Sequence, residues 1–212
     1  MKVIKSGGLL ISCCMLCGCL SGGVNYTRPT QANNSKSNSV VIEKSKETIW
    51  KELIPALGKE FWVINNIDKD SGLINISYNG DPEKYIDCGT IDSSVSNARG
   101  DRKYVFPASK AYEKYEAVAN NNLIFVERKM TLEGRINLIV QEITTNQSQV
   151  SANSKYVVTK SFIARDVMGH SQSDTETISF NSGQGSSFKQ GQTECYATGE
   201  LEAAVLGLLK SK

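Results

Sequence analysis

Residues 123–145 read Leu123-Ile-Phe-Val-Glu-Arg-Lys-Met-Thr-Leu132-Glu-Gly-Arg135-Ile-Asn-Leu-Ile-Val-Gln-Glu-Ile-Thr-Thr145. Both halves are rich in apolar and β-branched residues, which is typical of strands. The dipeptide Glu133-Gly134 between them suits a tight turn. We therefore predict a strand over residues 123–132, a turn, and a second strand over residues 135–145.

Further strand candidates lie on both sides of this pair. Residues 112–119, 156–164 and 175–180 extend the sheet, and residues 61–65 and 73–78 form a hairpin around the turn-forming segment 68–72. Residues 85–89 suit a short extended segment. Residues 90–103 are polar and are predicted to form a loop, as are the Gly/Ser/Gln-rich residues 181–193.

Two helices are predicted, one before the strands and one after them. The first covers residues 46–58, with Ser45 as N-cap and Pro55 expected to kink it or end it early. Thr198 is expected to cap the second. Their apolar faces are Ile49, Trp50, Leu53, Ile54 and Leu57 in the first, and Leu201, Val205, Leu208 and Leu209 in the second. We predict an α+β fold, an antiparallel sheet with an N-terminal and a C-terminal helix packed on one face.

The N-terminus has the layout of a bacterial lipoprotein signal peptide. Lys2 and Lys5 precede a short apolar run that ends in cysteines, and the run is too short to span a bilayer. Residues 16–19 resemble a lipobox, which makes Cys19 the predicted lipid acceptor and residues 1–18 the signal peptide. Cys13 is the alternative acceptor, but cleavage there would leave a shorter apolar core.

The mature chain divides into a tether and one domain. Residues 20–40 are rich in Ser, Asn and Gly and show no apolar periodicity, so residues 19–40 are predicted to be the lipidated cysteine and a flexible tether. Residues 41–212 are expected to form a single periplasm-facing domain. Cys88 and Cys195 are the cysteines of this domain, and an oxidising compartment favours a disulfide between them over two buried thiols.

Charge excludes one class of function. Removing Lys2 and Lys5 with the signal peptide leaves 22 basic and 22 acidic residues. A balanced chain lacks the basic stripe of nucleic-acid-binding proteins, so no nucleic-acid partner is expected. The same balance offers no attraction to a membrane surface, so the lipid would have to anchor the protein.

Catalytic motifs are not evident in the sequence. His170 is the single histidine, and Gly169-His170-Ser171-Gln172-Ser173 lacks the last glycine of a nucleophile elbow, so a polar turn is the better interpretation. Residues 68–72 do not follow the calcium-loop pattern, and no metal or cofactor is expected. The carboxylate pairs Glu113/Glu116 and Glu200/Glu202 leave open a glycan hydrolase. A ligand groove would draw on the aromatic residues Tyr112, Tyr115, Phe125 and Tyr156, although strand aromatics are usually core.

One stretch resembles a known family. Trp50, Leu53 and Leu57 are followed by Phe61-Trp62-Val63-Ile64 and then by Asp70-Ser71-Gly72-Leu73-Ile74. This order resembles the helix-grip unit of outer-membrane lipoproteins such as BamC, a member of the β-barrel assembly machinery. The resemblance implies a helix-grip-like fold and a place in the outer membrane.

The sequence thus predicts a lipid-anchored envelope protein with a non-catalytic structural or protein-binding role. Leu20 and Ser21 are not the Asp that commonly retains lipoproteins at the inner membrane, so the outer membrane is favoured in a Gram-negative host. The expected partners are the membrane, through the lipid, and an envelope protein. The alternatives are a periplasmic glycan hydrolase that uses carboxylates and a carrier that holds a small apolar ligand between helix and sheet.

Overall fold

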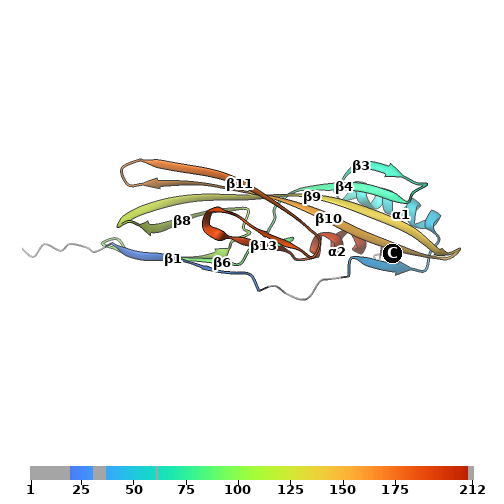
Figure 1. Cartoon of the computed structure of the whole chain (residues 1–212), viewed down its shortest axis with the longest axis horizontal. Coiled ribbons are helices and arrows are strands. Elements are labelled where there is room, and N and C mark those ends of the chain that lie inside the picture. The colour runs from blue at the N-terminus through green and yellow to red at the C-terminus, as the bar shows by residue number, and fades with distance from the viewer. Residues whose placement is uncertain (1–19, 31–36, 61, 210–212) are drawn as a thin grey trace, which may run out of the picture.

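The computed structural model describes residues 20–30, 37–60 and 62–209. Of these residues, 61% lie in strands and 14% in helices. The molecule is long and narrow, and its strands run along the long axis (Figure 1). The prediction of an α+β fold with two helices on one sheet face is therefore wrong, because the described part of the chain is mostly β and its two α-helices cover only part of the sheet.

A single long hairpin forms the centre of the molecule. Strand β9 (Asn122–Thr144) pairs with strand β10 (Gln147–Asp166) along nearly the whole length of both. With 23 residues at roughly 3.3 Å each, β9 is about 75 Å long. The predicted turn at Glu133-Gly134 is wrong, since both residues lie in the middle of β9.

Gly134 is a strand residue because a helix packs directly on it. A Cβ at this position would lie only 2.6 Å from Cδ2 of Leu201, which is fully buried in helix α2 (Glu200–Gly207). A glycine inside a strand often marks such a close approach. From sequence alone, the same residue resembled the second position of a turn.

Replacing Gly134 by alanine should lower the free energy of unfolding by about 1–3 kcal/mol, because the added methyl group overpacks a buried contact. Chemical denaturation would measure the loss. Combining it with Leu201→Ala should cost less than the sum of the two single changes, because the shortened side chain makes room. The matched control is Gly207→Ala, where a new Cβ meets no heavy atom within 4 Å. Equal stability of Gly134→Ala and the wild type would contradict the packing argument.

The remaining strands of the large sheet flank the hairpin at its two ends. Strands β3 (Val63–Asp68) and β4 (Leu73–Gly80) extend it from one end of β9, and β8 (Tyr112–Ala119) pairs with the other end. On the β10 side, β2 (Ser39–Ile42) and β11 (Ser171–Asn181) pair with opposite ends. The predicted hairpin over residues 61–78 is present as β3 and β4.

The even-numbered residues of β9 and β10 face the interior, and two different layers cover them. In one half of the molecule the cover is α2 and helix α1 (Lys46–Lys59), which begins at the predicted N-cap Ser45 and continues through Pro55. The buried residues of both helices join one core cluster with the hairpin. They are Ile49, Trp50, Leu53 and Leu57 in α1, and Leu201, Val205 and Leu206 in α2.

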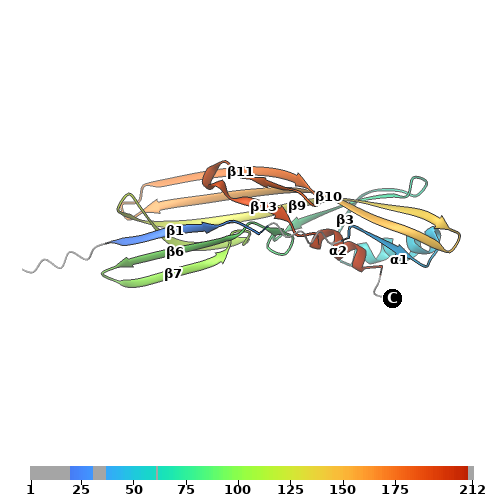
Figure 2. The same ribbon diagram turned by 60° about the horizontal axis from the view of Figure 1, so that its bottom comes forward.

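A second sheet covers the other half (Figure 2). It contains β1 (Ser21–Thr27), β6 (Thr90–Asn97) and β7 (Gly100–Pro107), in the order β1-β6-β7. Residues 90–103, predicted as a loop, thus form most of a hairpin, because Ile91, Ser93 and Val95 face inward with a two-residue period. The predicted tether is wrong for residues 21–27, which pair with β6 along their whole length.

A small third sheet joins the two halves. It consists of β5 (Ile86–Asp87), β12 (Gly185–Ser187) and β13 (Glu194–Ala197), with the short 3-10 helix η1 (Gln190–Gln192) before β13. The predicted disulfide between Cys88 and Cys195 is confirmed, with both residues fully buried and their Cα atoms 4.0 Å apart. It links the residue directly after β5 to β13.

Candidate functional site

The predicted lipid acceptor Cys19 and the alternative Cys13 lie outside the described residues. The described chain begins at Leu20, and β1 begins at the next residue, Ser21. A lipid on Cys19 would therefore be separated from the folded sheet by a single residue. The start of β1 and the turn between β10 and β11 lie at the same end of the molecule (Figures 1 and 2).

The β10–β11 turn exposes two apolar side chains and is held by Asp166. Val167 and Met168 are 64% and 82% exposed. One oxygen of Asp166 accepts the backbone N–H groups of Met168 and His170, both at 2.9 Å, and the other lies 2.8 Å from Nδ1 of His170. The hydrogen bond from His170 is the main cause that holds the pKa of Asp166 below its ordinary value. His170 therefore has a structural partner in this turn.

Each carboxylate considered for hydrolysis either has a close hydrogen-bond or ion-pair partner or occupies a position in a helix. Glu113 is ion-paired with Lys110, and Glu116 lies 2.7 Å from Nε of Arg102. Glu202 is buried, and its two oxygens accept the hydroxyl groups of Ser182 at 2.6 Å and Tyr156 at 2.8 Å. Glu200 is the first residue of α2. None of these contacts forms the pair of facing carboxyl groups that glycan hydrolysis uses.

The four aromatic residues considered for a ligand groove do not all meet at one place. Tyr156 is fully buried and stacks on Phe180 in the core. Tyr112 and Phe125 are 42% and 43% exposed. Tyr115 and Phe125 both line the first of the two hollows described below, and Tyr115 also lines the second.

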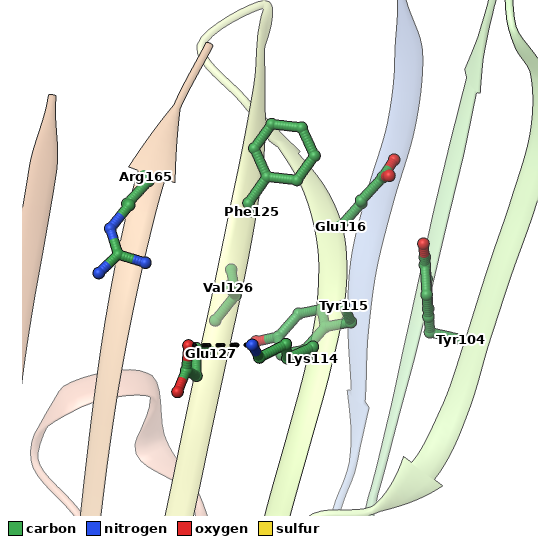
Figure 3. Close-up of a pocket in the computed structure, with 8 residues that line it drawn as sticks. All are labelled: Tyr104, Lys114, Tyr115, Glu116, Phe125, Val126, Glu127 and Arg165. Atoms are coloured by element: carbon green, nitrogen blue, oxygen red, sulfur yellow. Dashed lines mark ion pairs between the residues drawn. The ribbon is translucent and has the colours of Figure 1, made fainter. Parts of the chain in front are cut away.

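A hollow on the outside of the molecule, here called the outer hollow, has a volume of about 300 Å³. Figure 3 shows Lys114 and Glu116 from β8, Phe125 and Glu127 from β9, and Arg165 from β10 around it. Nζ of Lys114 lies 3.5 Å from Glu127, and Glu116 is held by Arg102. A hydrogen bond from Tyr112 is the largest cause that lowers the pKa of Glu127. That direction suits a permanent anion and opposes a role as general acid.

A second hollow lies between the large sheet and the second sheet, and it is called the inter-sheet cavity. It also has a volume of about 300 Å³. Strands β1 and β6 line one wall, β8, β9 and β10 line the other, and η1 lies at its margin. Its residues are Val24, Tyr26, Ile91, Tyr115, Val126, Arg128, Lys160, Phe162, Ala164, Gln190, Gly191 and Thr193.

Two cations lie in the wall of the inter-sheet cavity. Arg128 and Lys160 are only 4% and 6% exposed. The register of β9 and β10 sets Arg128 opposite Phe162, so Lys160, two residues away, is its diagonal neighbour on the same face. Burial lowers the pKa of both groups, because the loss of water disfavours their charged forms. The positive charge of Arg128 also lowers the pKa of Lys160.

Sequence reasoning missed both cations, although the sequence contains a signal for them. Arg128 and Lys160 share the two-residue period of the apolar positions Val126, Met130 and Val158. A charged residue that shares the spacing of a row of buried apolar residues indicates a buried charge. The burial of Arg128 and Lys160 could be inferred from this spacing only once β9 and β10 were known to be continuous strands covered on that face.

Comparison with family models, curated proteins and solved structures finds no match for this chain. The resemblance of residues 50–74 to BamC-like lipoproteins therefore stays a prediction. Across the residues that the structure describes, no three His, Cys, Asp or Glu side chains gather as metal ligands would. None of the helices in that part of the chain has the length and apolarity to cross a membrane.

Proposed function

We propose that the protein is a lipid-anchored envelope protein with a non-catalytic structural or protein-binding role, held with its N-terminal end on the outer membrane. The observation that carries this proposal is the position of β1. It begins two residues after the predicted acceptor Cys19, at the end of the molecule that also presents Val167 and Met168. A short lipidated N-terminus would thus bring these apolar side chains to the membrane surface.

In this orientation the long hairpin would hold the far end of the molecule away from the membrane. If β9 points away from the membrane, its far end lies on the order of 70 Å from the lipid surface. That half carries α1 and the β3–β4 hairpin (Figure 1). Strand β3 is the last strand of the large sheet in the described residues, and it exposes Val63 and Ile67. A free edge strand of this kind is suited to a protein partner that adds a strand.

The orientation predicts that the β10–β11 turn touches lipid. A tryptophan introduced by Met168→Trp should be strongly quenched by brominated lipids when the protein is reconstituted in vesicles. The matched control is Ile143→Trp, an apolar position of 49% exposure near the opposite end of β9. The wild type supplies the background of Trp50 and Trp62. Equal quenching of the two variants would rule out the orientation.

The glycan hydrolase has less support in the structure than this binding role. Hydrolysis needs one carboxylic acid with a raised pKa beside a second carboxylate. Glu113 and Glu116 are ion-paired, and Glu202 is fixed by two hydroxyl groups in the helix-covered half. The carrier was expected to hold its ligand between helix and sheet, but that interface is filled by buried core residues.

A further inference from the structure

The inward-facing rows of β9 and β10 contain a charge that the fold does not balance. Along these rows, Arg128 and Lys160 are the buried cations in an otherwise largely apolar surface. Moving an isolated charge out of water costs far more than burying a neutral polar group. Each of the two cations therefore requires a partner, and their contacts show whether the protein supplies one.

Lys160 has its partners within the protein. Its Nζ donates a hydrogen bond to the backbone oxygen of Gln190 at 2.6 Å and lies 3.7 Å from a carboxylate oxygen of Glu176. It also lies 4.3 Å from the ring centre of Phe188. Glu176 is fixed in turn by the backbone N–H groups of Lys189 and Gln190. This lysine therefore belongs to a balanced ion pair.

Arg128 has no such partner. Both terminal nitrogens of its guanidinium group are buried and make no hydrogen bond to any described residue. The residue opposite it on β8 is Glu113, whose carboxylate is ion-paired with Lys110 instead. Arginine remains charged in proteins, so it cannot escape the cost of burial by losing its proton. An anion from outside the protein would supply the missing partner.

The inter-sheet cavity next to Arg128 is mostly apolar. Val24 and Ile91 line it from the second sheet, and Val126, Phe162 and Ala164 line it from the large sheet. Its volume of about 300 Å³ is at the small end of the range for ligand sites. A site with one planar, doubly donating cation and apolar walls fits a ligand with an acidic head and an apolar body.

We infer that the inter-sheet cavity binds a small anionic amphiphile, with its carboxylate or phosphate head on Arg128 and its apolar body between the two sheets. The head would accept hydrogen bonds from both terminal nitrogens of the guanidinium group. Lys160 adds positive potential beside them. This site does not depend on the proposed lipid anchor, and it differs from a site between helix and sheet in both place and ligand charge.

Isothermal titration of the purified full-length protein with decanoate and with decyl phosphate tests the inference. Decanol is the neutral probe of the same chain length, and empty nanodiscs supply the background if the protein is held in nanodiscs. We expect saturable binding of at least one acidic probe and none of decanol. Binding of decanoate alone or of decyl phosphate alone identifies the head group and supports the site.

Arg128→Met should weaken binding of the acidic probe about tenfold to a hundredfold, because hydrogen bonds to a charged head are lost. Its denaturation midpoint should be unchanged or higher, since an unbalanced buried charge has been removed. A merely structural arginine would instead give a lower midpoint. The matched control is Arg135→Met on the same strand, where the arginine is exposed and paired with Glu133.

A second variant keeps Arg128 and removes the space. Ala164→Phe places a large side chain in the cavity wall and should block the acidic probe without changing any charge. The inference is overturned if the wild type binds no acidic probe, since water would then be the only partner of Arg128. It is also overturned if decanol binds as well as decanoate, or if Arg128→Met and Ala164→Phe both bind like the wild type.

Discussion

The Cys19→Ala protein is expected to carry no acyl group and to leave the membrane fraction. Without the predicted signal peptide the chain has a balanced charge, so electrostatics would not hold it at a lipid surface. Burying Val167 and Met168 would contribute only about 1.5–3 kcal/mol each, which is too little for stable attachment. Incorporation of labelled palmitate measures the acylation, and membrane fractionation measures the attachment. We expect Cys19→Ala to lose both completely.

The matched control is Cys13→Ala, which removes the alternative acceptor and leaves Cys19 in place. This variant should take up palmitate and remain on the membrane like the wild type. Mass spectrometry of the wild type should then find the acyl group on an N-terminal Cys19. Label retained by Cys19→Ala but lost from Cys13→Ala would move the acceptor to Cys13 and lengthen the segment before β1.

Removing the disulfide should produce the largest loss of stability. The bond between Cys88 and Cys195 spans 107 residues of sequence. In the chain-entropy model, a loop of this size contributes about 4–5 kcal/mol by restricting the unfolded chain. The double variant Cys88→Ala with Cys195→Ala should therefore unfold at a much lower denaturant concentration. Changing both residues avoids leaving one buried thiol without its partner.

Wild-type protein with a reductant is the control for the double variant. Its unfolding midpoint should fall toward that of Cys88→Ala with Cys195→Ala, whereas the reductant should not affect the variant. An unchanged midpoint in both cases would show that the bond contributes little to the free energy of unfolding. Free thiols at both cysteines in peptides mapped without reductant would contradict the bond itself.

Local signals in the sequence were enough to predict several elements correctly. Helix α1 follows from the spacing of Ile49, Leu53 and Leu57 and from the N-cap Ser45, all within one short segment. The β3–β4 hairpin follows from two apolar runs around a turn-forming segment. The pairing of Cys88 with Cys195 follows from their being the only two candidates in the domain.

The errors lie where a residue's meaning depends on distant parts of the chain. Residues 90–97 resembled a loop because their many serines make the two-residue alternation of buried and exposed positions hard to recognise. That alternation becomes meaningful only when another sheet packs on one face of the strand. Residues 21–27 resembled a tether for a similar reason: as an edge strand, β1 keeps most of its side chains in solvent. Its pairing partner β6 begins more than 60 residues later.

By itself, the sequence determined helix α1, the β3–β4 hairpin and the disulfide, because each depends on neighbouring residues or on a short list of cysteines. The lipid anchor stays a prediction. Only the tertiary structure decided that β9 is one strand, because the contact of Gly134 with Leu201 distinguishes a packing glycine from a turn glycine. It also decided the inter-sheet cavity. Arg128 becomes a buried, unpartnered charge only because the second sheet closes over the even-numbered face of the hairpin.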